Sequence, residues 1–126
     1  MFKVLEGGEG PVLAVEISGS YTVEDVKAFE KAAEARLAQG HPRLNILIKI
    51  DRMDWLKIKP QAFFQDAKYA MEHIKQMRHL AIVGDSKLEE VLVKLDNLIF
   101  GREKQELIEK YFDVSDLDQA WEFVRS

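Results

Sequence analysis

The sequence contains no cysteine among its 126 residues and only three prolines. Without cysteine, a disulfide framework, a thiolate nucleophile and a cysteine-based zinc site are excluded. No apolar run approaches the roughly 18 residues that a membrane-spanning helix needs. The first ten residues show a short strand pattern ending in a glycine turn, so we expect neither a secretory signal nor a transmembrane helix. A cysteine-free chain is compatible with a reducing compartment, which predicts a cytoplasmic protein.

The sequence also lacks an excess of basic residues, and its formal net charge is -4. Binding to a phosphate backbone normally requires a clustered basic face, so a nucleic-acid partner is not expected. The charges are unevenly distributed: residues 43–59 are mainly basic, and the region from Glu103 onward is acidic. This pattern fits two solvated surfaces, or alternatively the complementary ends of a homodimer.

Hydrophobic residues make up 47% of the chain, enough for one core, so residues 1–126 are predicted to form a single domain. The glycine-rich segment 7–10 predicts an antiparallel hairpin between the first two strands. After this hairpin, strands and helices alternate, which predicts right-handed crossovers and parallel strands. The predicted fold is α/β with the order ββαβαβαβα and a mainly parallel five-stranded sheet with an antiparallel N-terminal strand. The expected strands are 2–6, 11–18, 44–51, 78–84 and 107–113.

Four helices are expected, one after each strand from the second to the fifth. Thr22 and Asp25 form the pattern of an N-terminal cap, and Pro60 suits the first position of the second helix. Ser86 is expected to cap the third helix and Ser115 the fourth.

The segment LNILIKID, residues 44–51, has two different faces. Because side chains alternate along a strand, Ile46 and Ile48 point to one side, while Lys49 points to the other. A sheet covered on both faces would have continuous apolar strands, so the helices are expected mostly on one face. The opposite face is predicted to be open and to carry Glu16, Asn45, Lys49, His79 and Tyr111.

Ligands of parallel α/β sheets bind beyond the carboxyl ends of the strands. The loops 18–22, 51–59 and 84–87 should therefore be neighbours. Serine and aspartate in these loops are also typical of ordinary helix capping. The apolar residues near Trp55 are also consistent with a loop that covers the hydrophobic core. The candidate ligand-binding residues are Tyr21, Arg52, Trp55, Phe64, Ser86 and Lys87.

No catalytic set is evident. Asp51 and Asp54 could bind a divalent cation or act as acid and base, but the intervening Arg52 favours simple charge pairing. No histidine has a partner at metal-ligand spacing, and no serine has an identifiable base. We therefore predict no catalytic residue, metal site or cofactor, and an enzyme using Asp51, Asp54 and Lys87 remains a third hypothesis.

The element order and the segments IKID, VGDSKLEE and KYFDVSDLDQAWEFV resemble the SpoIIAA-like branch of the STAS domains over the whole chain. The resemblance implies a one-sided βα superhelix shared with anti-sigma factor antagonists and CRAL-TRIO lipid-binding domains. In phosphorylatable members, a serine or threonine begins the helix after the third strand. Residues 52–59 contain no hydroxyl side chain, so this phosphoswitch is not carried over.

The leading hypothesis is a non-catalytic binding or regulatory module, homodimeric, that acts through protein contacts at the open sheet face or the tryptophan loop. The alternative is a binder of a small apolar or amphipathic ligand at the loops after the second, third and fourth strands. In that case Arg52 or Lys87 would pair with an acidic head group.

Overall fold

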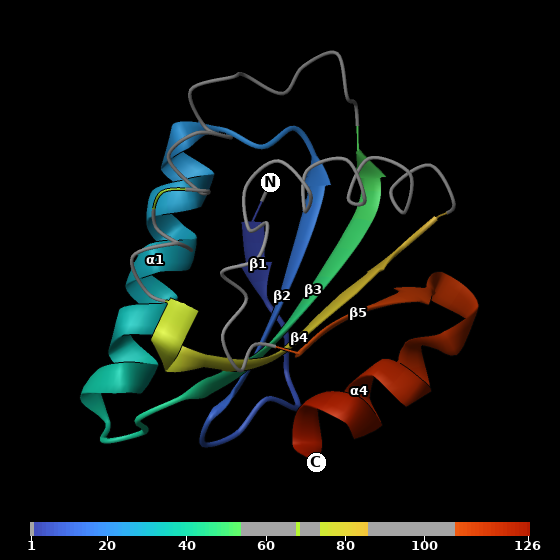
Figure 1. The fold of residues 1–126 in the computed structure, drawn as a ribbon. Helices are drawn as coiled ribbons and strands as arrows, with labels where there is room; N and C mark the ends of the chain where they lie inside the picture. The colour runs from blue at the N-terminus through green and yellow to red at the C-terminus, as the bar shows by residue number, and fades with distance from the viewer. Residues whose placement is uncertain (1, 54–67, 69–73, 86–107) are drawn as a thin grey trace.

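The computed structural model describes residues 2–53, 68, 74–85 and 108–126 (Figure 1). Five strands form one sheet in the order β1-β2-β3-β4-β5. Strand β1 is antiparallel to β2, and the other neighbouring pairs are parallel, which confirms the predicted mixed sheet. The strands are β1 (Phe2–Val4), β2 (Val12–Gly19), β3 (Leu44–Met53), β4 (Met77–Gly84) and β5 (Ile108–Asp113).

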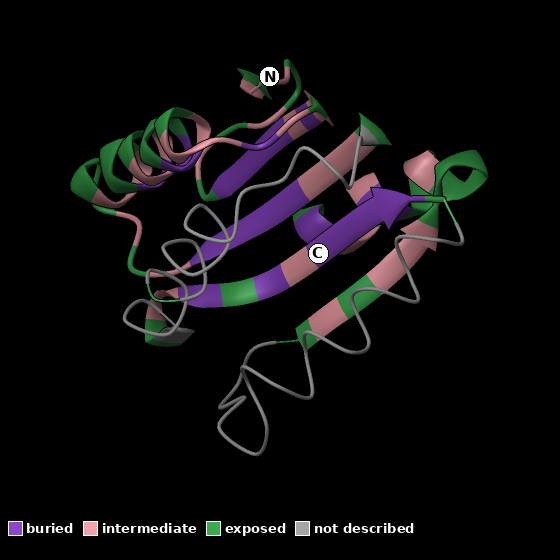
Figure 2. Ribbon diagram, turned by 90° about the horizontal axis from the view of Figure 1, so that it is seen from above, coloured by how far each residue is buried: buried purple, intermediate pink, exposed green. Residues whose placement is uncertain are grey.

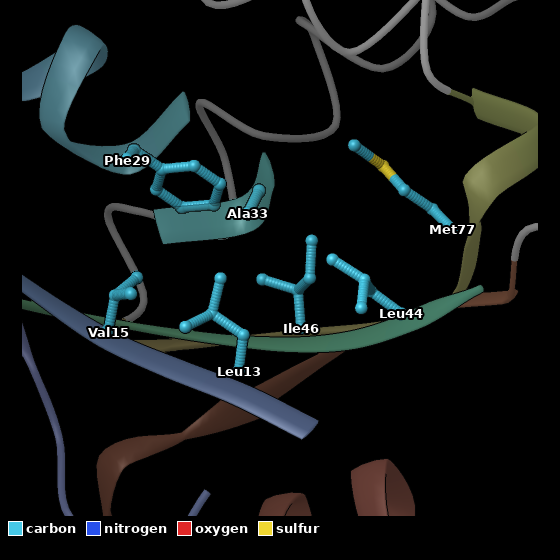
Figure 3. Close-up of a cluster of buried hydrophobic side chains, with 7 residues drawn as sticks. All are labelled: Leu13, Val15, Phe29, Ala33, Leu44, Ile46 and Met77. Atoms are coloured by element: carbon cyan, nitrogen blue, oxygen red, sulfur yellow. The ribbon is translucent and has the colours of Figure 1, made fainter. Parts of the chain in front are cut away.

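Helix α1 (Val23–Ala38) covers one face of the sheet. It begins at a capping box: the Thr22 hydroxyl accepts a hydrogen bond from the Asp25 N–H at 3.3 Å, and the Asp25 carboxylate accepts one from the Thr22 N–H at 3.0 Å. This confirms the predicted cap. The buried contact between helix and sheet, shown in Figure 3, consists of Leu13, Val15, Phe29, Ala33, Leu44, Ile46 and Met77.

Helix α4 (Leu117–Arg125) covers the opposite face. Its Ala120 and Val124 are buried against a second cluster, to which β3 contributes Leu47. Thus Ile46 faces α1 while its neighbour Leu47 faces α4, as the alternation along the strand requires. The two described helices lie on opposite faces, and the helices expected after Pro60 and Ser86 fall outside the described residues.

Burial is concentrated in the middle of the sheet (Figure 2). Strands β2 and β4 are largely buried, whereas β5 has no fully buried residue. The 3-10 helix η2 (Ile74–Gln76) leads directly into β4, which begins at Met77. In the described part of the chain, the core therefore consists of three parallel strands with α1 on one face and α4 on the other.

The turn between β1 and β2 is tied to both helices. A Cβ added to Gly8 would lie 2.8 Å from the Val12 carbonyl oxygen, so only glycine fits there without a shift. From α1, Arg36 donates hydrogen bonds to the carbonyl oxygens of Gly8 and Val12, each at 3.1 Å. From α4, Arg125 donates one to the Gly7 carbonyl oxygen at 3.1 Å.

The start of α4 differs from the predicted cap at Ser115. The Asp113 carboxylate accepts hydrogen bonds from the Ser115 backbone N–H at 3.0 Å and from the Ser115 hydroxyl at 2.7 Å. These bonds cap the 3-10 helix η3 (Val114–Asp116), and α4 begins after it without a side-chain cap. The Ser115 prediction was wrong because the serine donates its hydroxyl hydrogen to Asp113 instead of accepting from α4.

The pKa of the Asp113 carboxyl is lowered, first by the Ser115 backbone hydrogen bond and then by the Ser115 hydroxyl. Since the folded-state pKa is below the unfolded one, these bonds stabilise the fold above the unfolded pKa, and the contribution is lost as pH falls through the folded pKa. We expect Ser115→Ala to raise the Asp113 pKa part of the way to its ordinary value. An NMR titration of the carboxyl carbon measures this change. Ser126→Ala is the control, and an unchanged Asp113 titration in Ser115→Ala would contradict the assignment.

Candidate functional site

The carboxyl ends of β2, β3 and β4 lie at one edge of the sheet (Figure 1). Ser18 at the end of β2 is in register with Asp51 of β3, and Lys49 of β3 with Val83 of β4. The described parts of the three loops, 18–22, 51–53 and 84–85, therefore begin at this edge. We call it the carboxyl edge.

Arg52 occupies a bulge at the carboxyl edge. Ser18 pairs with Asp51, but the next residue of β2, Gly19, pairs with Met53, so Arg52 is the extra residue on β3. Its φ of 49° is left-handed, and it is the only non-glycine residue with positive φ among the described residues. This conformation costs a residue with a Cβ about 1–2 kcal/mol. The Arg52 residue is exposed.

The other predicted ligand-binding residues do not gather around Arg52 in the described part of the chain. Tyr21 is only 8% exposed and packs with Ile17 and Val26, so its ring belongs to the core. Trp55, Phe64, Ser86 and Lys87 lie outside the described residues.

The N-terminus of α1 is already occupied by a carboxylate. The Asp25 side chain accepts hydrogen bonds from the Thr22 N–H at 3.0 Å and the Thr22 hydroxyl at 3.1 Å. Backbone N–H groups at a helix N-terminus attract anions. At α1 the capping box places a negative charge of the chain itself there, where the helix dipole stabilises it.

Two residues predicted on the open face, Asn45 and His79, are instead buried beneath α4, each 6% exposed. Asn45 Nδ2 donates to the Val124 carbonyl oxygen at 2.8 Å, and His79 Nδ1 lies 2.9 Å from the Phe123 carbonyl oxygen. Since a carbonyl oxygen only accepts, the second bond requires the hydrogen on Nδ1. The prediction was wrong here because these side chains satisfy the terminal carbonyl groups of a helix that packs on this face.

Tyr111 lies on the other face from the one predicted. It is in register with Ile82, while Lys110 is in register with Ala81 beneath α4. The Tyr111 hydroxyl is a hydrogen-bond donor to the carbonyl oxygens of Gly84, at 2.6 Å, and Asp85, at 2.5 Å. Its role in the described structure is to hold the end of β4.

The remaining open-face residues, Glu16 and Lys49, form an ion pair at 3.4 Å, with side chains 24% and 30% exposed respectively. Exposed Lys3 is in register with Glu16, and exposed Asp51 lies two positions beyond Lys49 on the same face. We call Lys3, Glu16, Lys49 and Asp51 the charged strip. It continues directly into Arg52 at the carboxyl edge.

Among the described residues, no helix is long and apolar enough to cross a membrane. Within residues 2–53, 68, 74–85 and 108–126, no cluster of three or more histidine, aspartate or glutamate side chains could hold a metal ion. The sequence indicates Arg52 as a candidate ligand-binding residue, but it does not predict the left-handed backbone conformation of Arg52. No glycine or asparagine marks this position in the sequence as left-handed.

Comparison with known proteins supports the fold. An uncharacterized protein of the DUF3478 family from Shewanella loihica PV-4, described as having a SpoIIAA-like fold, is similar with a TM-score of 0.71. The similarity covers 98% of this chain and 92% of that chain at 24% identity, which shows the fold alone. Comparison with curated proteins gave no match. The SpoIIAA-like family model matches residues 12–125, so the chain belongs to the SpoIIAA-like family.

Proposed function

We propose that the chain is a non-catalytic protein-binding or regulatory module whose contact surface is the carboxyl edge together with the charged strip. The observation that carries this proposal is the exposed, left-handed Arg52. Residues 52–59 contain no hydroxyl side chain, so the module works without the phosphorylation that switches other members at this point.

The bulge itself does not require arginine. Glycine adopts a left-handed conformation without strain, and asparagine adopts it more readily than other residues. Arginine at φ 49° thus costs stability that glycine or asparagine would recover. Strained residues that persist on a surface are concentrated at binding and switch regions, and bulges there re-aim side chains. We infer that Arg52 is present for its guanidinium group.

The charged strip extends the same surface across β3, β2 and β1. Its charges alternate in sign from Lys3 through Glu16 to Lys49. Charges arranged in this way contribute orientation and specificity to a protein interface more than affinity. The homodimer and the cytoplasmic location expected from the sequence remain proposals. A second copy of this chain is one partner that the surface could bind, and light scattering would detect such a dimer.

The amphipathic-ligand hypothesis is less favoured by the described residues. Tyr21 is part of the core, and the α1 N-terminus at the carboxyl edge already holds the capping carboxylate of Asp25. A protein partner needs neither of these groups.

Arg52→Asn is expected to raise the free energy of unfolding by about 1 kcal/mol, because asparagine tolerates the left-handed backbone. At the same time it should weaken partner binding. Urea denaturation measures the first effect. Lys31→Asn, at an exposed position of helix α1, is the control, and there asparagine should lower stability slightly because it is a poorer helix former than lysine.

Partner contact is tested by photo-cross-linking: a photoreactive amino acid is incorporated at position 51, and the cells that make the protein are irradiated. A cross-linked product is expected from position 51 and not from position 34, which is exposed on α1. The product should decrease when Arg52→Asn is added. Equal cross-linking from position 34, or a product that Arg52→Asn leaves unchanged, would overturn the proposed surface.

A further inference from the structure

The chemistry around Arg52 indicates the class of group that it binds. Resting on the proposed function, we infer that the protein partner presents a carboxylate, from glutamate or aspartate, to the Arg52 guanidinium. Arg52 is exposed, and the structure gives its side chain no ion pair or hydrogen bond within the described residues. A guanidinium group presents a planar fork of N–H donors, which matches the two oxygens of a carboxylate or phosphate group.

The neighbouring charges distinguish a carboxylate from a phosphate. Exposed Asp51 precedes Arg52, exposed Asp85 follows β4, and Asp25 caps α1, which follows β2. All three carboxylates belong to the carboxyl edge, where a phosphate monoester with a charge near -2 would be repelled more strongly than a single carboxylate. Phosphate recognition in proteins commonly uses several arginines. The described part of the carboxyl edge supplies Arg52 alone.

Asp51 and Arg52 do not pair with each other in the described structure, although they are adjacent. Along β3, Asp51 belongs to the face of the charged strip, and the bulge begins at the next residue. Within the described residues the Arg52 guanidinium group is therefore unpaired, while a carboxylate stands beside it. This arrangement favours a monoanionic group, because a group with more negative charge is repelled more strongly by Asp51.

The test is an NMR titration of the isotopically labelled full chain, following the Arg52 Nε–Hε signal and the backbone amide signal of Met53. The probe is a capped serine hexapeptide with one glutamate, and the comparison probe is the same peptide with phosphoserine in place of the glutamate. We expect the glutamate peptide to shift both signals, and Arg52→Lys to weaken the apparent affinity at the Met53 amide about tenfold through loss of the bidentate hydrogen bond. Asp51→Asn should strengthen binding of the glutamate peptide, because it removes a repelling charge.

Tighter binding of the phosphoserine peptide than of the glutamate peptide would overturn the inference, as would a shift of the Met53 amide signal that is equal in Arg52→Lys. A backbone spectrum of each variant that matches the parent excludes misfolding as the cause. If the glutamate peptide leaves the Arg52 signal unchanged while the cross-link from position 51 forms, only the carboxylate inference fails. If the cross-link is also absent, the proposed binding surface fails with it.

Discussion

Replacing Leu47 with alanine is expected to lower the free energy of unfolding by about 2–5 kcal/mol. Leu47 is 0% exposed and lies in the cluster between the sheet and α4, where Ala14, Ala81 and Ala120 bring the helix close to the strands. The loss combines the transfer of the removed methyl and methylene groups with the cavity that remains. Urea denaturation measures the change, and faster hydrogen exchange of α4 amides would locate it.

Leu37→Ala is the matched control, since the same atoms are removed from a partly buried position on α1. Its cost should be clearly smaller, both because less buried area is lost and because alanine favours a helix. A loss in Leu47→Ala no larger than that in Leu37→Ala would show that the α4 cluster contributes little to stability.

Asn45→Ala is expected to cost about 2–4 kcal/mol, because it leaves two buried backbone groups without their partners. The side-chain Oδ1 of Asn45 accepts a hydrogen bond from the His79 backbone N–H at 3.2 Å, and its side-chain Nδ2 donates one to the Val124 carbonyl oxygen at 2.8 Å. A side chain of β3 thereby joins β4 to the last turn of α4. Denaturant unfolding measures the loss, and hydrogen exchange of the His79 amide should accelerate.

Lys49→Ala is the control on the same strand and face, where the ion pair with Glu16 is partly exposed. Exposed ion pairs contribute little, so this change should cost at most about 1 kcal/mol. If Asn45→Ala were no more destabilising than Lys49→Ala, water would be satisfying the groups that Asn45 now bonds.

Local signals in the sequence predicted the elements well. The capping pair Thr22 and Asp25 lies within four residues, and the alternation through Ile46 and Leu47 follows from strand geometry alone. At Ser115 two local patterns competed. A serine that could accept from a helix N–H instead donates to Asp113, two residues earlier.

Long-range arrangement was not predictable in the same way. Nothing within the α4 segment specifies which face of the sheet it covers, so Asn45 and His79 were assigned to solvent. Tyr111 was misplaced because its face depends on the register between β4 and β5, and a shift of one residue reverses the assignment. The left-handed backbone of Arg52 arises from mismatched pairing with β2, which is also a tertiary property.

The strand order has a consequence for how the chain folds. Because β1 to β5 are neighbours in the sheet in the order of the sequence, each strand can add to an edge that earlier residues have already formed. The sheet can therefore grow in one direction as the chain is synthesised, without a strand having to insert between two others. The hydrogen bond from Arg125 to the Gly7 carbonyl oxygen spans 118 positions and is available only after β5 has been synthesised, because Arg125 follows β5 in the sequence. We expect this contact to be the last to form in folding.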